Sequence, residues 1–276
     1  MRQNTTNSPG RYLLAGVCIV AAFIVLYVYF VRTESGQRID QLAYNGAEFG
    51  WRSVTPVTRR LLDALPGISG VIGFVLTVII VLVRRNWTTF VVALGAAAAA
   101  AASTQILKYA ILTRPDFGVE GFADNSFPSG HTTVAAASAL AVFLVASART
   151  RPIVAGLGGA YTVIAGASTL ANQWHRPSDV IAALLVVAFW GCVAGFLLAV
   201  LIPGRSDARA TGRSRLLLWL IGPFVVVAAI AFVLTLINST KDDPDTVIAY
   251  IGGVASIIAV GFTLTVMAVR TFARLP

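Results

Sequence analysis

The apolar residues of this 276-residue chain gather into eight long stretches with polar segments between them. These stretches cover residues 12–31, 68–83, 86–107, 131–147, 153–171, 178–202, 216–238 and 246–269. A bilayer core of about 30 Å needs roughly 20 apolar residues per helix, so the pattern predicts a transmembrane helix for each stretch. The first stretch is too long for the apolar region of a cleavable signal, and we interpret it as a retained span.

The composition agrees with this pattern. Hydrophobic residues make up 57% of the chain and charged residues only 12%, whereas about a quarter of the residues of soluble proteins are charged. The sequence therefore predicts an all-α fold, a polytopic membrane helix bundle of about eight transmembrane helices with a six-helix core. We divide it into an N-terminal helix and outer loop (1–67), a core (68–202), and a basic cytoplasmic loop with a terminal helix pair (203–276). The 32–67 loop is expected to lie on the membrane surface.

The basic residues indicate topology and not a nucleic-acid partner. The net charge is +9, but a nucleic-acid-binding protein clusters its basic residues on one face or arm. Here they lie in the loops between the spans, and the short loops on the side of the chain ends are the richer in arginine. Because cytoplasmic loops carry the excess of positive charge, we expect both termini in the cytoplasm.

The chain contains only two histidines, and each lies in a short polar segment at the mouth of an apolar stretch. A single histidine in such a place is most simply an interfacial residue. His131, however, closes a Phe-Pro-Ser-Gly-His segment, so the backbone N–H groups of Ser129 and Gly130 are expected at a helix N-terminus. Such a terminus attracts phosphate.

The second histidine has a carboxylate nearby in the sequence. His175 is followed four residues later by Asp179, and Pro177 suits the first position of a helix. A carboxylate at this spacing can bind one ring nitrogen, fix the tautomer and leave the other nitrogen free to attack. Alternatively, Asp179 only caps the helix. Upstream, Lys108 and Arg114 offer two cations for phosphate oxygens, although a lysine there could also snorkel.

All these segments face the same side of the membrane, because they follow the third span, precede the fourth, and separate the fifth from the sixth. Together they resemble the type 2 phosphatidic acid phosphatase superfamily. Its three sequence blocks are Lys with Arg-Pro, Pro-Ser-Gly-His, and Ser-Arg followed by His and Asp. The similarity covers about residues 68–202 and leaves the first span and the last two unexplained.

The resemblance implies a role for each residue. His175 would form a phosphohistidine, Asp179 would orient it, and His131 would protonate the leaving oxygen. The residues expected to bind the phosphate are Lys108, Arg114, Ser129 and Gly130. The family uses no metal or organic cofactor, so none is expected here.

Two departures from the family pattern concern phosphate ligands. Five residues separate Lys108 from Arg114, where the family has six, and Thr169 stands where the family has an arginine. The missing guanidinium removes a bidentate, charge-assisted contact with the phosphate. Arg176 could supply this charge from another direction, but we interpret it as an interfacial arginine and do not assign it to the site.

The predicted function is metal-independent hydrolysis of a lipid phosphate or diphosphate at the outer face of the cytoplasmic membrane. The alternative is a degenerate member of the same fold that binds lipid phosphate without turnover, which Thr169 favours. A vanadium haloperoxidase shares the phosphate-binding blocks, but the spans favour a lipid. Polyprenyl phosphates or diphosphates, phosphatidic acid and phosphatidylglycerol phosphate remain open. The composition, rich in arginine and alanine, is typical of GC-rich bacterial genomes and favours a cell-envelope lipid. The sequence does not indicate the oligomeric state.

Overall fold

The computed structural model of the chain describes residues 9–51, 56–119, 121, 125–202, 214–241 and 243–273. Helices account for 84% of it, and no strand occurs among the described residues. The prediction of an all-α fold is therefore confirmed.

Each predicted apolar stretch corresponds to one helix. The helices are α1 (Gly10–Arg32), α2 (Glu34–Trp51), α3 (Pro56–Arg84), α4 (Trp87–Ile106), the π-helical turn η1 (Leu107–Ile111), α5 (Gly130–Val145), α6 (Arg151–Ala171), α7 (Pro177–Leu201), α8 (Ser214–Asn238) and α9 (Thr246–Thr271). Within the described residues, six helices are long and apolar enough to cross a membrane, namely α1, α4 with η1, α6, α7, α8 and α9. The apolar part of α3 and the whole of α5 are shorter. The chain is a multi-pass membrane protein.

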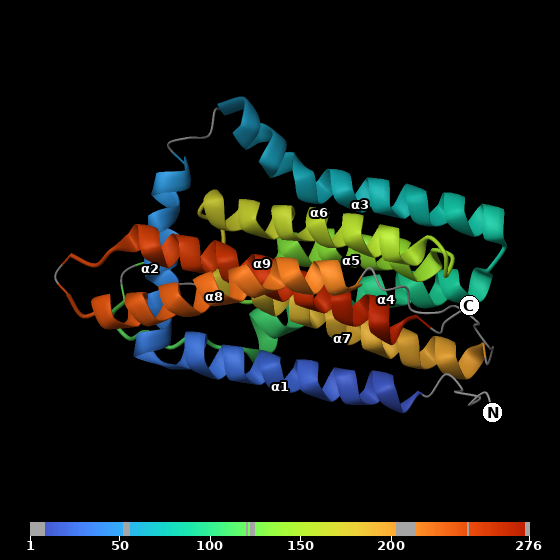
Figure 1. The fold of residues 1–276 in the computed structure, drawn as a ribbon, viewed down its shortest axis with the longest axis horizontal. Helices are drawn as coiled ribbons and strands as arrows, with labels where there is room; N and C mark the ends of the chain where they lie inside the picture. Colours follow the sequence, from blue (N-terminus) through green and yellow to red (C-terminus); the bar gives the residue numbers. More distant parts are fainter. Residues whose placement is uncertain are drawn as a thin grey trace.

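The apolar helices run side by side, and α2 crosses one end of the bundle (Figure 1). Helix α1 begins and α9 ends at the opposite end. Helix α7 lies in the centre, where it packs against α1, α4, α5 and α9. It is apolar around its whole circumference, and such a helix is stable only when it is enclosed by others or by lipid. Accordingly, 56% of its span is buried inside the protein, against 17% for α1.

Helix α2 is where the structure differs from the prediction. The 32–67 segment was expected to be a loop on the membrane surface, but most of it forms α2 and the first turns of α3. Helix α2 packs on α1, α6, α7, α8 and α9. Its inner face carries the buried side chains of Gln37, Asp40 and Gln41 and the half-buried Tyr44. These residues fall at i, i+3, i+4 and i+7, which is one face of a helix.

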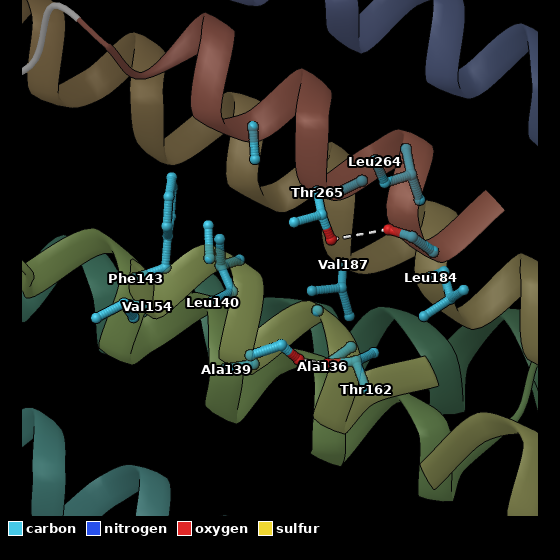
Figure 2. A pocket seen from close by; sticks show the side chains of 16 residues that line it. Ala136, Ala139, Leu140, Phe143, Val154, Thr162, Leu184, Val187, Leu264 and Thr265 are labelled. Carbon is cyan, nitrogen blue, oxygen red and sulfur yellow. Dashed lines mark hydrogen bonds between the residues drawn. The ribbon is translucent and has the colours of Figure 1, made fainter. Parts of the chain in front are cut away.

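An apolar cavity of about 120 Å³ lies between α5, α6, α7 and α9, and Figure 2 shows the side chains that line it. Most of these are alanine, glycine, leucine and valine. The hydroxyls of Thr162 and Thr265 donate to carbonyls of their own helices, at Gly158 and Gly261. Since the lining offers little polar chemistry and contains neither histidine, we interpret this cavity as a packing feature of the bundle.

Candidate active site

The loop between α6 and α7 presents His175. Helix α6 ends at Ala171, and the carbonyl of Thr169 then accepts hydrogen bonds from the backbone N–H groups of Trp174 and His175. Gln173 adopts a φ of 55°, which turns the chain sharply toward α7. The imidazole of His175 is only 8% exposed, so the loop delivers it into the interior of the protein.

Asp179 lies beside this imidazole, in the first turn of α7. Its Oδ2 is 3.4 Å from Nδ1 of His175 and accepts hydrogen bonds from the Ser126 hydroxyl (2.7 Å) and the Arg176 backbone N–H (3.0 Å). The carboxylate is fully buried. With Nδ1 directed at a carboxylate, the other ring nitrogen, Nε2, is the one left for a substrate. The 3.4 Å contact is long for a hydrogen bond, as contacts in active sites commonly are before a substrate binds.

His131 lies in the first turn of α5 and faces the second histidine. The centroids of the His131 and His175 rings are 5.9 Å apart, and the rings are inclined by 60°. The ring of Trp174 lies 5.0 Å from that of His131 and flanks it on another side. Unlike His175, His131 is exposed. Two histidines that are 44 residues apart in sequence therefore meet, one buried and one open to the surroundings.

The start of α5 after Ser129 presents backbone amides. The Ser129 hydroxyl accepts from the N–H of Thr132 and so caps α5, while the Ser129 N–H donates to the carbonyl of Asp179 (2.9 Å). The amides of Gly130 and His131 have no acceptor among the described residues. These amides, at the positive end of the helix dipole, are the ones suited to an anion.

Lys108 lies in the π turn η1 that continues α4. A π turn leaves carbonyl groups without their ordinary helical partners, and here the Asn125 side chain donates to the carbonyls of Lys108 (3.0 Å) and Leu112 (2.9 Å). The half-buried ammonium of Lys108 interacts electrostatically with His131 and Asp179. The Asn125 side chain thus joins the first sequence block to the residues just before the second block.

Helices α1 and α2 hold the chain on both sides of Arg114. The hydroxyl of Tyr27 donates to the carbonyl of Thr113 (2.8 Å), and Gln37 donates to the carbonyl of Pro115 (2.8 Å). The Nη1 atom of Arg114 is buried and makes no hydrogen bond with any described residue. A buried guanidinium nitrogen without an acceptor is costly unless an anion binds there, so this atom suits an anionic ligand.

Four charged side chains interact around the start of α7. Burial and the charge of Arg176 lower the pKa of Arg114, while Asp40 and Asp179 act in the opposite direction. Burial first, and then the charge of Asp179, raise the pKa of Asp40 from 3.8 to about 6, although Ser178 and the two arginines favour its ionised form. Because the pKa of Asp40 is raised in the folded state, its protonated form stabilises the fold. This contribution is full below pH 3.8 and is lost as the pH rises through about 6.

Arg176 was interpreted as an interfacial residue, but the structure places it inside the site. Its side chain is 2% exposed, its Nε donates to Gln41 (2.8 Å), and its Nη1 donates to Ser126 (3.1 Å). Ser126 in turn donates to Asp179. The sequence signal was the position of Arg176 directly after His175. The side chain of Thr169, by contrast, donates to the carbonyl of Gly166 (2.8 Å) and brings no positive charge.

Asp40, Gln41 and Tyr44 were also missed by the sequence analysis. Asp40 contacts Ser178 beside Asp179, and the Tyr44 hydroxyl donates to the carbonyl of Gln173 in the histidine loop. Their spacing on one helical face was the available signal. Among the described residues, no three His, Cys, Asp or Glu side chains gather as a metal site. The donors that do gather are cations and backbone amides, which suit an anion.

Residues 87–203 match the PAP2 superfamily, and this confirms the resemblance that the sequence motifs suggested. The match contains every predicted site residue, from Lys108 to Asp179, and leaves α2, with Asp40 and Gln41, outside it. No curated protein and no solved structure matches the chain.

Proposed function

Since residues 87–203 match the PAP2 superfamily, we propose that the chain is an integral membrane phosphatase that hydrolyses a lipid phosphate or diphosphate through a phosphohistidine. The observation that carries the proposal is the pair of facing imidazoles. One of them, His175, has Asp179 on Nδ1, and the other, His131, lies 5.9 Å away between ring centroids. Lys108 and Arg114 lie close enough to interact with the same carboxylate, Asp179.

In the first step, Nε2 of His175 attacks phosphorus and the bond from phosphorus to the lipid oxygen breaks. With a monophosphate, the lipid oxygen takes a proton from His131 and a neutral alcohol leaves, whereas with a diphosphate the bridging oxygen leaves as part of the lipid phosphate. Asp179 stabilises the positive charge that develops on the imidazole of His175. Lys108, Arg114 and the Gly130 amide bind the phosphoryl oxygens, while Ser129 shapes the helix start that presents this amide.

In the second step, water attacks the phosphohistidine. His131, now neutral, takes a proton from the water, the bond between phosphorus and Nε2 breaks, and inorganic phosphate leaves. Both histidines then regain their starting protonation states. Because His131 alternates between acid and base, its open position in the first turn of α5 suits contact with both the lipid oxygen and water.

An apolar groove beside the phosphate residues supports a lipid substrate. It lies between α1, α4 with η1, and α7, and its volume is about 280 Å³. Leu107 and Ile111, which flank Lys108 in η1, both line it, and Val20 lines it from α1. A hydrocarbon chain in this groove would place its phosphate next to Lys108. We therefore prefer a polyprenyl phosphate or diphosphate, phosphatidic acid or phosphatidylglycerol phosphate to a soluble ester.

A Val20→Trp variant should weaken binding of the lipid without slowing the chemistry. The larger ring would displace one or two buried CH₂ groups of the chain, at about 0.8 kcal/mol each, which is about a tenfold increase in KM. Turnover of a water-soluble phosphate ester should not change. The matched control is Val25→Trp, because Val25 lies on the same helix, is 68% exposed and does not line the groove. An equal effect of both variants on KM would contradict this role of the groove.

We further propose that the site faces the outside of the cytoplasmic membrane. The site lies at the α2 end of the bundle, opposite the start of α1 and the end of α9 (Figure 1), and the arginine bias supports cytoplasmic chain ends. In a variant without native cysteines, a cysteine at the exposed Asp116 should react with an impermeant maleimide in intact cells. A cysteine at Arg149, in the α5–α6 connection, should react only after permeabilisation. The opposite pattern would reverse the orientation.

The decisive experiment is phosphate release by the purified protein in detergent, from a panel of these lipids, with and without EDTA. We expect release from at least one lipid and no effect of EDTA. The rival function, binding without turnover, has one observation in its favour, which is that Thr169 supplies no cation. Saturable binding of a lipid phosphate with no release of phosphate would support that rival. Loss of activity in EDTA and its recovery with magnesium would contradict metal independence.

A further inference from the structure

We propose that Asp40 of α2 is a positioning residue of the reaction, which holds the first turn of α7 and, through it, the pair formed by His175 and Asp179. This inference rests on the proposed function. It concerns a residue outside the segment that matches the family, on a helix that the matching segment does not contain.

Asp179 accepts from the backbone N–H at the N-cap of α7, but the N-cap side chain cannot accept from the first amides of the helix. Arg176 stands at the N-cap position and has no acceptor atom, while Pro177 has no N–H to donate. The first free amide of the helix is that of Ser178, and it donates to Oδ1 of Asp40 (3.1 Å). The Ser178 hydroxyl donates to Oδ2 of the same carboxylate. Asp40 thus supplies, from another helix, the acceptor for the Ser178 amide that the N-cap side chain of α7 cannot offer.

The turn of α7 that Asp40 contacts lies next to the residues proposed to catalyse the reaction. Ser178 directly precedes Asp179, whose Oδ2 lies 3.4 Å from Nδ1 of His175. The carbonyl of Asp179 also accepts from the backbone N–H of Ser129, which ties α7 to the start of α5. A shift of Ser178 would therefore change both the orientation of His175 and its distance from His131. Displacements of about 1 Å in a catalytic group can cost on the order of 100-fold in rate.

Helix α2 is itself fixed against the first and third sequence blocks. Gln37 donates to the carbonyl of Pro115 in the first block, and Gln41 accepts from Arg176 in the third. Tyr44 donates to the carbonyl of Gln173. Asp40 lies in the middle of this polar face and is 1% exposed. Burial disfavours its charge, and a carboxylate kept in such a place is more typical of a functional site than of a packing surface.

The test compares Asp40→Ala with Asp40→Asn in the purified full-length protein. Asp40→Ala should lower kcat about 10- to 100-fold and change KM by less than about threefold, because it misplaces the nucleophile without touching the substrate. Asp40→Asn keeps an acceptor for the Ser178 amide and removes a buried charge, so it should stay folded and within about fivefold of the wild-type kcat. The double variant Ser178→Ala/Asp40→Ala should have a kcat within about twofold of that of Asp40→Ala, because the two residues act through the same contact.

The matched control is Glu34→Ala, which removes an exposed acidic side chain from the same helix and should leave kcat within about twofold. Thermal unfolding is measured for every variant. A folded Asp40→Ala variant with wild-type kcat would overturn the positioning role. So would an Asp40→Asn variant as slow as Asp40→Ala, because the charge and not the hydrogen-bonded cap would then matter.

Binding of orthovanadate, measured by calorimetry, separates failure of this inference from failure of the proposed function. Vanadate mimics the five-coordinate phosphoryl group on His175, so Asp40→Ala should bind it about 10- to 100-fold more weakly. A wild-type protein that neither releases phosphate nor binds vanadate contradicts the proposed function. If the wild-type protein releases phosphate or binds vanadate, and Asp40→Ala does so equally well, only the role of Asp40 is overturned.

Discussion

A His175→Ala variant is expected to release no phosphate from any ester, whether its leaving group is good or poor. The substitution removes the atom that attacks phosphorus, so neither a better leaving group nor a higher substrate concentration can restore the first step. The expected loss is at least about 10⁴-fold in kcat, as for other residues that act as a unit with a base and an orienting carboxylate. Phosphate release from a lipid phosphate and from an aryl phosphate measures it.

The covalent intermediate gives this prediction an independent readout. Wild-type protein mixed with a ³²P-labelled lipid phosphate and quenched in alkali should retain label on the chain, since phosphohistidine is acid-labile and survives alkali. His175→Ala should retain none, while its thermal unfolding shows whether the fold is intact. Label on a folded His175→Ala protein would contradict the assignment of His175 as the nucleophile.

The bundle was predictable because lipid imposes a simple rule on the chain. Backbone groups in a bilayer must be satisfied within the segment, so long apolar stretches become helices. Helix α7 and its neighbours follow this rule from their apolar pattern alone. The convergence of Lys108, Arg114, His131 and His175 was predictable for a related reason, since helices that cross the membrane alternate in direction and place these segments at one end.

Helix α2 was not predicted by the same reasoning because its buried surface mixes polar with apolar side chains. An amphipathic helix is recognised when its buried face is apolar, whereas α2 buries the polar side chains of Gln37, Asp40 and Gln41 beside several apolar ones. Its mixed composition resembles that of a surface loop. The stripe at i, i+3, i+4 and i+7 carries the information, but it becomes meaningful only when the groups that face it are known.

The substitution at Thr169 was visible in the sequence, but its consequence was not. The sequence shows that an arginine is missing, and only the structure shows that Arg176 is buried beside Ser126 and Gln41. Arg176 follows His175 at an N-cap position, where the chain direction changes and side-chain direction cannot be deduced from helical periodicity. Positive charge therefore reaches the Asp179 side of the site from a residue that the family pattern does not mark.

His131 is expected to matter in proportion to the basicity of the leaving group. A lipid monoester releases an alkoxide-like oxygen that needs a proton, so His131→Ala should lower its kcat by about 10²- to 10⁴-fold. An aryl phosphate, or a diphosphate that releases a stable phosphate anion, needs that proton less and should lose about tenfold or less. The comparison is informative because both substrates use the same nucleophile, His175, which this substitution leaves in place.

The measurement is kcat for a series of phosphate esters with leaving groups of different pKa, for the wild type and for His131→Ala. The kcat of the variant should depend more steeply on leaving-group pKa, because no proton from His131 neutralises the charge that develops on the leaving oxygen. Ser138→Ala is the matched control, since this hydroxyl on the same helix donates only to the carbonyl of Val134 and should leave the slope unchanged. If good leaving groups instead rescued His175→Ala and not His131→Ala, the roles of nucleophile and acid would be reversed between the two histidines.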